Sequence, residues 1–173
     1  MIEEIRKNLF GISFRLFGSK VYLLKTKDKN ILIDTSSRIN RIELKNSLKK
    51  LGLGFLSIDV VLLTHNHFDH TGNIAQLKNA RIYGPELDFQ ESFIISIDKL
   101  EIPGIDVVKT PGHTKGSICY YMPKEKILFS GDTIFHNGIG RTDLPNSQPE
   151  KMAESLEKIR KLDIKILCPG HDY

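Results

Sequence analysis

The chain has 173 residues, of which 40% are hydrophobic and 27% charged, a composition typical of one globular domain that buries its core without disulfides. The net charge of +4 comes mainly from scattered lysines, which favours a solvated surface over a nucleic-acid-binding stripe. The apolar runs are strand-sized and no signal peptide is visible, so we expect one cytoplasmic domain over residues 1–173 without a membrane segment. Cys119 and Cys168 lie in apolar runs, as expected in a reducing compartment. The sequence makes no prediction of oligomeric state.

The first half of the chain predicts strands around one helix. The β-rich runs at residues 19–26 and 30–35 are separated by the turn-like KDKN and predict antiparallel strands. The run IDVVLLT at residues 58–64 predicts a strand buried on both faces. Between them we expect a helix from Arg38 to Leu51 with Gly52 as its stop, because apolar residues recur near helical spacing, namely Ile39, Ile42, Leu44, Leu48 and Leu51.

The second half predicts further strands and a second helix. Residues 105–110, 117–122 and 126–131 have the pattern of strands separated by turns that contain Gly or Pro, and residues 163–168 predict a last strand. In SQPEKMAESLEKIRKL, residues 147–162, Ser147 and Glu150 predict a capping box and Pro149 a first helical turn. The apolar stripe of this helix is expected at Met152, Leu156, Ile159 and Leu162. Strand-rich halves with a helix each indicate layered sheets flanked by helices.

Four of the predicted strands end at side chains that can bind a metal ion. The strand at residues 58–64 runs into the motif THNHFDH, and three later strands run into a histidine or an aspartate, each directly after a glycine. Rigid strands position what their terminal loops carry, so the donors would converge on one rim if these strands lie side by side. Unrelated surface histidines are the alternative, but so many donors at strand ends favour a metal site. The seven donors are His65, His67, Asp69, His70, His113, Asp132 and His171.

The spacing within THNHFDH indicates that its donors face two points. In an extended segment His65 and His67 are two positions apart and point the same way, so both can bind one metal ion. Asp69 and His70 follow the strand end, where the chain must turn, and would face a second ion. Imidazole suits zinc, iron or manganese, and an added carboxylate favours a hydrolytic or dioxygen-handling ion over a structural one. A helical conformation of the whole motif is disfavoured by the β-branched run before it.

These motifs resemble a known family. THNHFDH, TPGHTKGS, FSGDTIF and PGHDY occur in this order after the aspartate of ILIDT, and they resemble the metallo-β-lactamase superfamily over most of the chain. Within it, GDTIFHNGIGRTDLP and the terminal GHDY resemble the glyoxalase II-like (hydroxyacylglutathione hydrolase-like) branch. The resemblance implies an α+β fold, the four-layered αβ/βα sandwich. It also implies two divalent metal ions, for which zinc is expected and iron or manganese are the alternatives.

The resemblance assigns a role to each donor. The first metal ion would be held by His65, His67 and His113, and the second by Asp69, His70 and His171, with Asp132 bridging the two. Asp69 and Asp132 are the residues expected to serve catalysis. Asp34 matches an aspartate that orients the site without binding metal, and an ordinary turn residue at a strand end is the alternative.

The implied reaction is hydrolysis of a small-molecule thioester. Two metal ions roughly 3.5–4 Å apart would hold a bridging water and lower its pKa to near neutrality, so that hydroxide can attack the acyl carbonyl. Another ester or a lactone is an alternative substrate. The strongest rival from another class is a mononuclear iron persulfide dioxygenase, with iron held by His65, His113 and Asp132. A β-lactamase is disfavoured because Asp132 stands where those enzymes carry cysteine or serine.

The resemblance to glyoxalase II is incomplete around the substrate. That family has a C-terminal helical region that supplies basic residues to glutathione, whereas this sequence stops at Tyr173, so a small or open thioester fits as well as a glutathione conjugate. Tyr173 matches a tyrosine that can contact the substrate, with a loose terminal residue as the alternative. We interpret His136 as a loop histidine, and Arg141 and Asp143 as a pair within their own loop.

Overall fold

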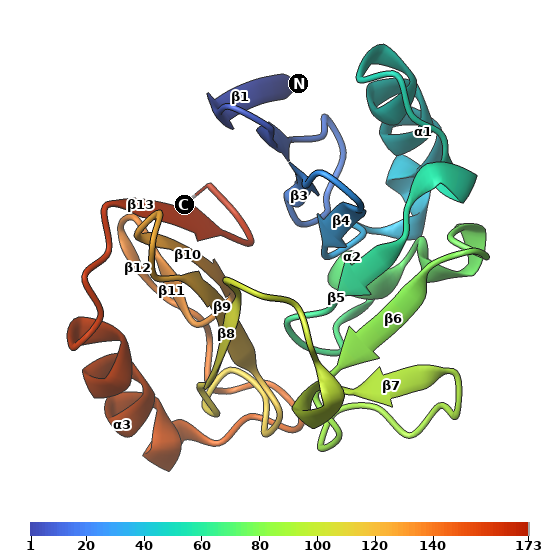
Figure 1. Ribbon diagram of the computed structural model, residues 1–173. Helices are drawn as coiled ribbons and strands as arrows, with labels where there is room; N and C mark the ends of the chain where they lie inside the picture. Colours follow the sequence, from blue (N-terminus) through green and yellow to red (C-terminus); the bar gives the residue numbers. More distant parts are fainter. Residues whose placement is uncertain (173) are drawn as a thin grey trace.

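Two β-sheets packed face to face form the centre of the computed structural model, which describes residues 1–172 (Figure 1). The first sheet contains seven strands in chain order: β1 (Ile2–Arg6), β2 (Leu9–Ile12), β3 (Val21–Lys25), β4 (Asn30–Ile33), β5 (Val60–Leu62), β6 (Arg81–Gly84) and β7 (Ile94–Ser96). Strands β1 to β4 are antiparallel, and β4 to β7 are parallel. The second sheet has the order β13-β10-β9-β8, with β8 (Asp106–Lys109), β9 (Ile118–Met122), β10 (Ile127–Gly131) and β13 (Ile166–Pro169).

The helices and a small hairpin complete the fold. The α-helices are α1 (Arg41–Lys50), α2 (Phe68–Thr71) and α3 (Pro149–Arg160), and the hairpin consists of β11 (Ile134–Phe135) and β12 (Gly138–Ile139). Short 3-10 turns occur at η1 (Arg38–Asn40), η2 (Phe55–Ser57), η3 (Ile74–Gln76) and η4 (Ile97–Lys99). None of the helices within residues 1–172 combines the length and apolarity that crossing a membrane requires.

Three apolar clusters show why the chain forms four layers. Side chains of both sheets, such as Ile33 of β4 and Phe129 of β10, bury one another between the sheets. Leu32, which points to the opposite face of β4, packs instead in the cluster that contains Leu48 of α1. On the outer face of the second sheet, Leu128 packs in the cluster that contains Ile159 of α3. Both sheets are therefore covered on two faces, and the expected αβ/βα sandwich is confirmed.

The first predicted helix is shorter than expected and buries fewer of its apolar residues. Residues 38–40 form the turn η1, and α1 begins at Arg41. Leu44 and Leu48 are buried, whereas Ile42 is 68% exposed and Ile39, in η1, is 62% exposed. Two positions separate Ile42 from Leu44, about 200° around a helix, so the two side chains face opposite sides. The apolar spacing that predicted this helix therefore does not mark a single buried face.

The predicted capping box of the second helix is also wrong. Helix α3 begins at Pro149 with Gln148 as its N-cap, and no side chain caps the first turn. Ser147 therefore lies one position before the cap, and its hydroxyl donates to the carbonyl of His113 at 2.8 Å. The apolar stripe is confirmed at Met152 and Ile159, which are buried. Ser147 thus connects the start of α3 to a loop that carries a candidate ligand.

The strands that carry the donors belong to both sheets and do not all lie side by side. Strand β5, which precedes His65, is in the first sheet, while β8, β10 and β13 are in the second. The sequence analysis missed β1, β2, β6 and β7, which extend the first sheet on both sides of β3, β4 and β5. The donors meet where strand ends of the two sheets face each other, because the sheets pack face to face.

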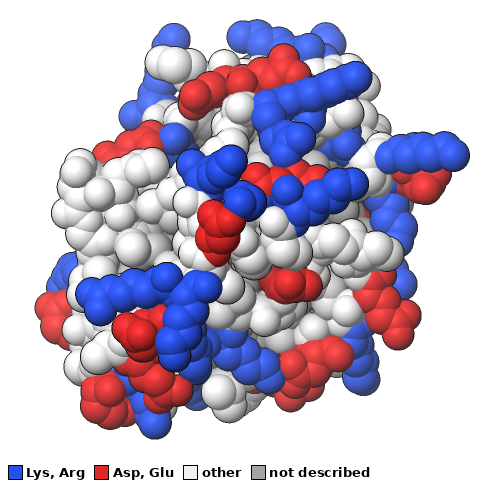
Figure 2. Space-filling model, turned by 60° about the vertical axis from the view of Figure 1, so that its left-hand side comes forward, with Lys and Arg blue, Asp and Glu red and all other residues white. Residues whose placement is uncertain are grey.

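The surface charges and the two cysteines agree with the expectations drawn from the composition. On the face drawn in Figure 2, lysine and arginine side chains are interspersed with acidic ones, and uncharged surface lies between them. Cys119 and Cys168 are both free and buried. Burial raises the pKa of the Cys119 thiol to about 11 and that of the Cys168 thiol to about 12, so both thiols remain protonated at neutral pH.

Candidate metal centre

The loop after β5 brings four donors to the gap between the sheets. The chain leaves β5 at Leu62, passes the extended residue His67, and then forms the one-turn helix α2. His65 therefore precedes the turn, while Asp69 and His70 lie within it, all three buried. The expected change of direction after the strand is confirmed, and its form is a helical turn. The remaining donors come from the second sheet and are His113, Asp132 and His171.

The first donor group consists of three imidazoles. His67 Nδ1 lies 3.1 Å from His65 Nε2 and 3.0 Å from His113 Nε2. The three rings are nearly perpendicular in pairs, with interplanar angles of 84°, 84° and 89°. Nitrogens so close together, converging from three directions, can share one cation. The structure thus brings together the three histidines that the sequence analysis assigned to one ion.

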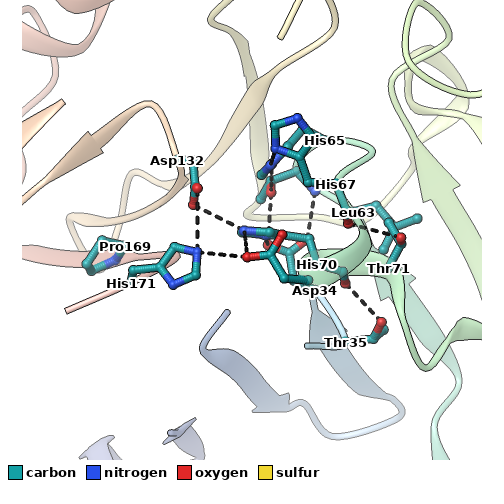
Figure 3. Close-up of polar contacts among 12 residues, drawn as sticks. Asp34, Thr35, Leu63, His65, His67, His70, Thr71, Asp132, Pro169 and His171 are labelled. Atoms are coloured by element: carbon teal, nitrogen blue, oxygen red, sulfur yellow. Dashed lines mark hydrogen bonds and ion pairs between the residues drawn. The ribbon is translucent and has the colours of Figure 1, made fainter. Parts of the chain in front are cut away.

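The second donor group is joined to the first by Asp132. His171 Nε2 lies 3.2 Å from Asp69 Oδ2, and His70 belongs to the same cluster. Asp132 Oδ1 lies 3.2 Å from His70 Nε2, and its Oδ2 lies 3.5 Å from His171 Nε2 (Figure 3). The same Oδ2 lies 3.6 Å from His113 Nε2 of the first group. One carboxylate therefore faces both groups.

The polar atoms at the centre fit a metal ion. Among the described residues, His70 Nε2 and Asp132 Oδ1 are buried and form no hydrogen bond, although they face each other. Buried polar groups normally have a partner, and a cation would satisfy both atoms at once. Gly170 keeps the space beside these two side chains open, because a Cβ at this position would lie 2.2 Å from Asp132 Oδ1 and 2.8 Å from His70 Cε1. The residues present therefore suit divalent ions in both groups.

Asp34 and Thr64 fix the orientation of two imidazoles from behind. Asp34, at the end of β4 with φ +56°, accepts a hydrogen bond from His70 Nδ1 at 2.8 Å. Its carboxylate also accepts from the backbone N–H of Thr64 at 2.9 Å and from the Thr64 hydroxyl at 2.8 Å. Because that hydroxyl donates to Asp34, it accepts from His65 Nδ1, 3.0 Å away. With Nδ1 as the donor, each imidazole can present the lone pair of its Nε2 to a cation at the centre.

The loop that carries His113 is held from two sides. His113 Nδ1 donates to the carbonyl of Arg141 at 2.8 Å, which again leaves Nε2 facing the centre. Asp88, just after β6, joins this loop to the first one. Its Oδ2 accepts from the backbone N–H of Asn66 at 3.1 Å and from the Thr114 hydroxyl at 2.7 Å, and its Oδ1 accepts from the N–H of Gly116 at 2.8 Å. Asn66 lies between two candidate ligands and Thr114 follows a third.

Sequence reasoning missed Thr64 and Asp88. Thr64 is the first residue of the motif THNHFDH, so its position beside His65 was a usable signal. Asp88 lies 22 residues from Asn66 and 26 from Thr114, in a segment without a recognisable motif, and no sequence signal marks it.

Neighbouring charges shift the pKa values of site residues in opposite directions. Burial, reinforced by the nearby His70, lowers the pKa of His65 well below its ordinary value, so this ring is neutral. Burial opposes a charge on His70, but Asp132 and Asp34 outweigh it and raise the pKa of His70 well above its ordinary value. Burial likewise opposes a charge on Asp132, but His70 and other histidines hold the pKa of that carboxyl well below its usual range. An ionised carboxylate among imidazoles favours binding of a cation.

A pocket of about 720 Å³ opens onto the donors. It is lined by donor residues of both groups and by the segment around β11 and β12, including Arg141. The predicted pairing of Arg141 with Asp143 is confirmed: Nε and Nη2 each donate to one carboxylate oxygen at 2.9 Å. His136 is exposed and belongs to neither donor group, as expected of a loop histidine. Tyr173 lies outside the described residues.

A four-layered αβ/βα sandwich with a histidine- and aspartate-lined centre between its sheets defines the class of protein. The family model of the metallo-beta-lactamase superfamily matches residues 15–88 and 85–171, and the chain belongs to this superfamily. The chain is 37% identical over 143 residues to a hydroxyacylglutathione hydrolase of Bartonella henselae, and the matched region covers 75% of this chain and 54% of that protein. The chain thus spans about half the length of this curated relative.

Solved structures agree with the family assignment. The crystal structure of TTHA1623 in a di-iron-bound form is similar with a TM-score of 0.80 and 25% identity, covering 95% of this chain and 92% of that one. The BLEG-1 B3 metallo-beta-lactamase is similar with a TM-score of 0.76 and 26% identity, covering 100% of this chain and 92% of that one. The expected superfamily and fold are therefore confirmed.

Proposed function

We propose that the protein is a metal-dependent hydrolase that cleaves a small thioester, with zinc in two adjacent sites. The observation that carries the proposal is the position of Asp132, whose carboxylate lies within 3.2–3.6 Å of His70, His113 and His171. A carboxylate shared between two donor groups supports two ions close together rather than one. The similar TTHA1623 has a di-iron-bound form, which supports two metal ions in this chain as well. Because those ions are iron, the experiment below also determines which metal this protein binds.

The chain would hold the first ion through His65, His67 and His113, and the second through Asp69, His70 and His171, with Asp132 between them. Two bound ions supply Lewis acidity and make hydroxide available near neutral pH. The contribution of the protein is to orient the donors. Asp34, Thr64 and the Arg141 carbonyl accept hydrogen bonds from Nδ1 of His70, His65 and His113, so that each Nε2 can face a bound ion.

The thioester is supported by the names of the curated relatives and by chemistry. Several relatives at 36–39% identity are named hydroxyacylglutathione hydrolase, an activity that splits a thioester. In this reaction the water oxygen joins the acyl carbon, the C–S bond breaks, and the sulfur leaves as a thiolate with the electron pair of that bond, which a proton released by the water then neutralises. A thiolate leaves without a strong general acid, so Asp69 and Asp132 can remain ionised and serve as donors.

A small-molecule substrate and a reducing compartment are further parts of the proposal. The mixed charges on the face drawn in Figure 2 and the modest net charge of +4 support a small substrate over nucleic acid, whose binding calls for clustered cations. The free, buried cysteines support a cytoplasmic location.

Metal analysis combined with a substrate panel tests the proposal. We expect two zinc ions per chain and hydrolysis of thioesters, including S-lactoylglutathione as one member of the panel. Asp132→Asn should abolish turnover and reduce the metal content while the circular dichroism spectrum is retained. One iron per chain with sulfide-dependent oxygen uptake would overturn the proposal in favour of a persulfide dioxygenase. Two bound ions with hydrolysis of lactones or esters alone would overturn the thioester assignment.

A further inference from the structure

The walls of the pocket in front of the donors are mostly carbon. Besides the donor side chains, six apolar residues line it, namely Phe17, Phe68, Phe135, Ile139, Leu144 and Pro145. The three phenylalanines gather around His171: the ring centroids of Phe17 and Phe135 lie 5.9 and 6.3 Å from that of His171, and Phe17 lies 5.9 Å from Phe68. An apolar surface therefore adjoins the reaction centre.

Part of this surface is exposed, which packing alone does not explain. Phe68 is 71% exposed, Phe17 56% and Ile139 49%. Phe68 follows His67 and precedes Asp69, so its place at the rim is set by the donors on either side. Large apolar side chains left open at the rim of a pocket are typical of a surface that a ligand covers. A ligand that buried them would gain free energy from the area removed from water.

The same pocket offers little to a negatively charged substrate. Among the described lining residues, Arg141 is the one lysine or arginine, and the Nε and Nη2 edge of its guanidinium group is paired with Asp143 in its own loop. The acidic residues of the lining are Asp69 and Asp132, which face the metal centre. A substrate carboxylate in this pocket would therefore meet one cationic side chain, whose charge is already balanced by Asp143.

We propose that the pocket selects thioesters with an uncharged, apolar acyl group, which lies against Phe17, Phe68 and Ile139. This inference rests on the hydrolase function proposed above and specifies its substrate class. Hydrolysis adds water across the C–S bond, so the products are the apolar carboxylic acid and the free thiol. The hydroxyacylglutathione that names the curated relatives has a polar acyl group and a charged peptide, whereas the acyl group proposed here is uncharged and apolar.

A homologous substrate series tests the selection with the metal-loaded protein. In acetyl, butyryl and hexanoyl thioesters of N-acetylcysteamine, we expect kcat/KM to rise about threefold to fourfold per buried methylene, the factor that apolar burial supplies. S-lactoylglutathione should be a poorer substrate than the hexanoyl thioester. Phe68→Ala and Phe17→Ala should flatten the dependence on chain length. Phe93→Ala is the matched control, since Phe93 is 58% exposed and does not line the pocket, and it should keep the wild-type slope.

A binding measurement separates this proposal from the hydrolase function. Calorimetry with the non-hydrolysable S-ethyl and S-hexyl thioethers of N-acetylcysteamine should show tighter binding of the longer chain, and Phe68→Ala should remove the difference. Equal binding of both thioethers, or a kcat/KM that is flat with acyl length or highest for S-lactoylglutathione, would overturn the apolar selection. Binding that depends on chain length, without hydrolysis of any thioester, would support apolar selection by the pocket and would refute the proposed hydrolase function.

Discussion

The carboxylate of Asp34 accepts a hydrogen bond from His70 Nδ1 at 2.8 Å, and both side chains are buried where β4 ends beside α2. Through Thr64 the same carboxylate is connected to His65, so one residue orients a candidate ligand of each donor group. The backbone of Asp34 has φ +56°, a region that aspartate and asparagine tolerate better than most residues. This conformation allows the contact to be tested without disturbing the main chain.

Replacing Asp34 with asparagine should weaken metal binding while the fold persists. Asparagine keeps the backbone conformation, but its amide offers one acceptor oxygen where the carboxylate offers two. We expect the affinity for zinc to fall by about 10- to 100-fold, the usual effect of losing a partner behind a metal-binding histidine. Competition against a chromophoric chelator measures the affinity, and circular dichroism checks the fold. Wild-type affinity in the variant would contradict the orienting role.

Asp88→Asn should chiefly lower the affinity for the metal ion held by His65, His67 and His113. The Asp88 carboxylate accepts three hydrogen bonds from the loops that carry these histidines. In asparagine, the side-chain NH₂ group replaces one acceptor oxygen, so at least one of these hydrogen bonds would be lost. Cobalt titration followed by visible absorption should show one weakened site and one that is nearly unchanged. Asp98→Asn is the control, because Asp98 pairs with Lys109 at the surface. Equal weakening of both sites would indicate a general loss of structure.

Two buried tyrosines should contribute measurably to stability. The Tyr120 hydroxyl of the second sheet donates at 2.8 Å to the carbonyl of Leu63, which directly follows β5 of the first sheet and lies two residues before His65. The Tyr22 hydroxyl of the first sheet donates to the carbonyl of Pro169 in the second, at 2.7 Å, two residues before His171. Phenylalanine at either position leaves a buried carbonyl without this donor, which should lower the free energy of unfolding by about 1–3 kcal/mol.

Urea denaturation of Tyr22→Phe and Tyr120→Phe measures this loss. Tyr121→Phe is the comparison, since the Tyr121 hydroxyl donates to the carbonyl of Asp163 at a partly buried position that water can reach. Its loss should be smaller than about 1 kcal/mol. Equal losses in all three variants would show that the contacts between the sheets carry no special weight.

The two thiols should be unreactive in the folded protein. Burial raises the pKa of Cys119 to about 11 and that of Cys168 to about 12, and only the thiolate reacts with alkylating agents. At pH 8, well below both values, we expect labelling by iodoacetamide to be negligible in buffer and to reach two groups per chain in denaturant. Rapid labelling of the native protein at pH 8 would show that these strands open to solvent.

The identity of the donors and most of the strands could be predicted from the sequence because these features are local. Alternating and continuous apolar runs mark β3, β4 and β5, and a donor placed directly after a strand is held near its end whatever the rest of the fold. Strands β6 (Arg81–Gly84) and β7 (Ile94–Ser96) were missed because each depends on pairing with a neighbouring strand: β6 pairs with β5, and β7 pairs with β6.

The amino-acid sequence by itself determined which side chains could bind a metal ion and the spacing of those within one loop. Only the tertiary structure decided that the donors come from two sheets, that Asp132 faces both groups, and that Asp88 joins two loops. The physical reason is that covalent connectivity fixes distances over a few residues. Distances between loops tens of residues apart depend on how the apolar faces of the two sheets pack.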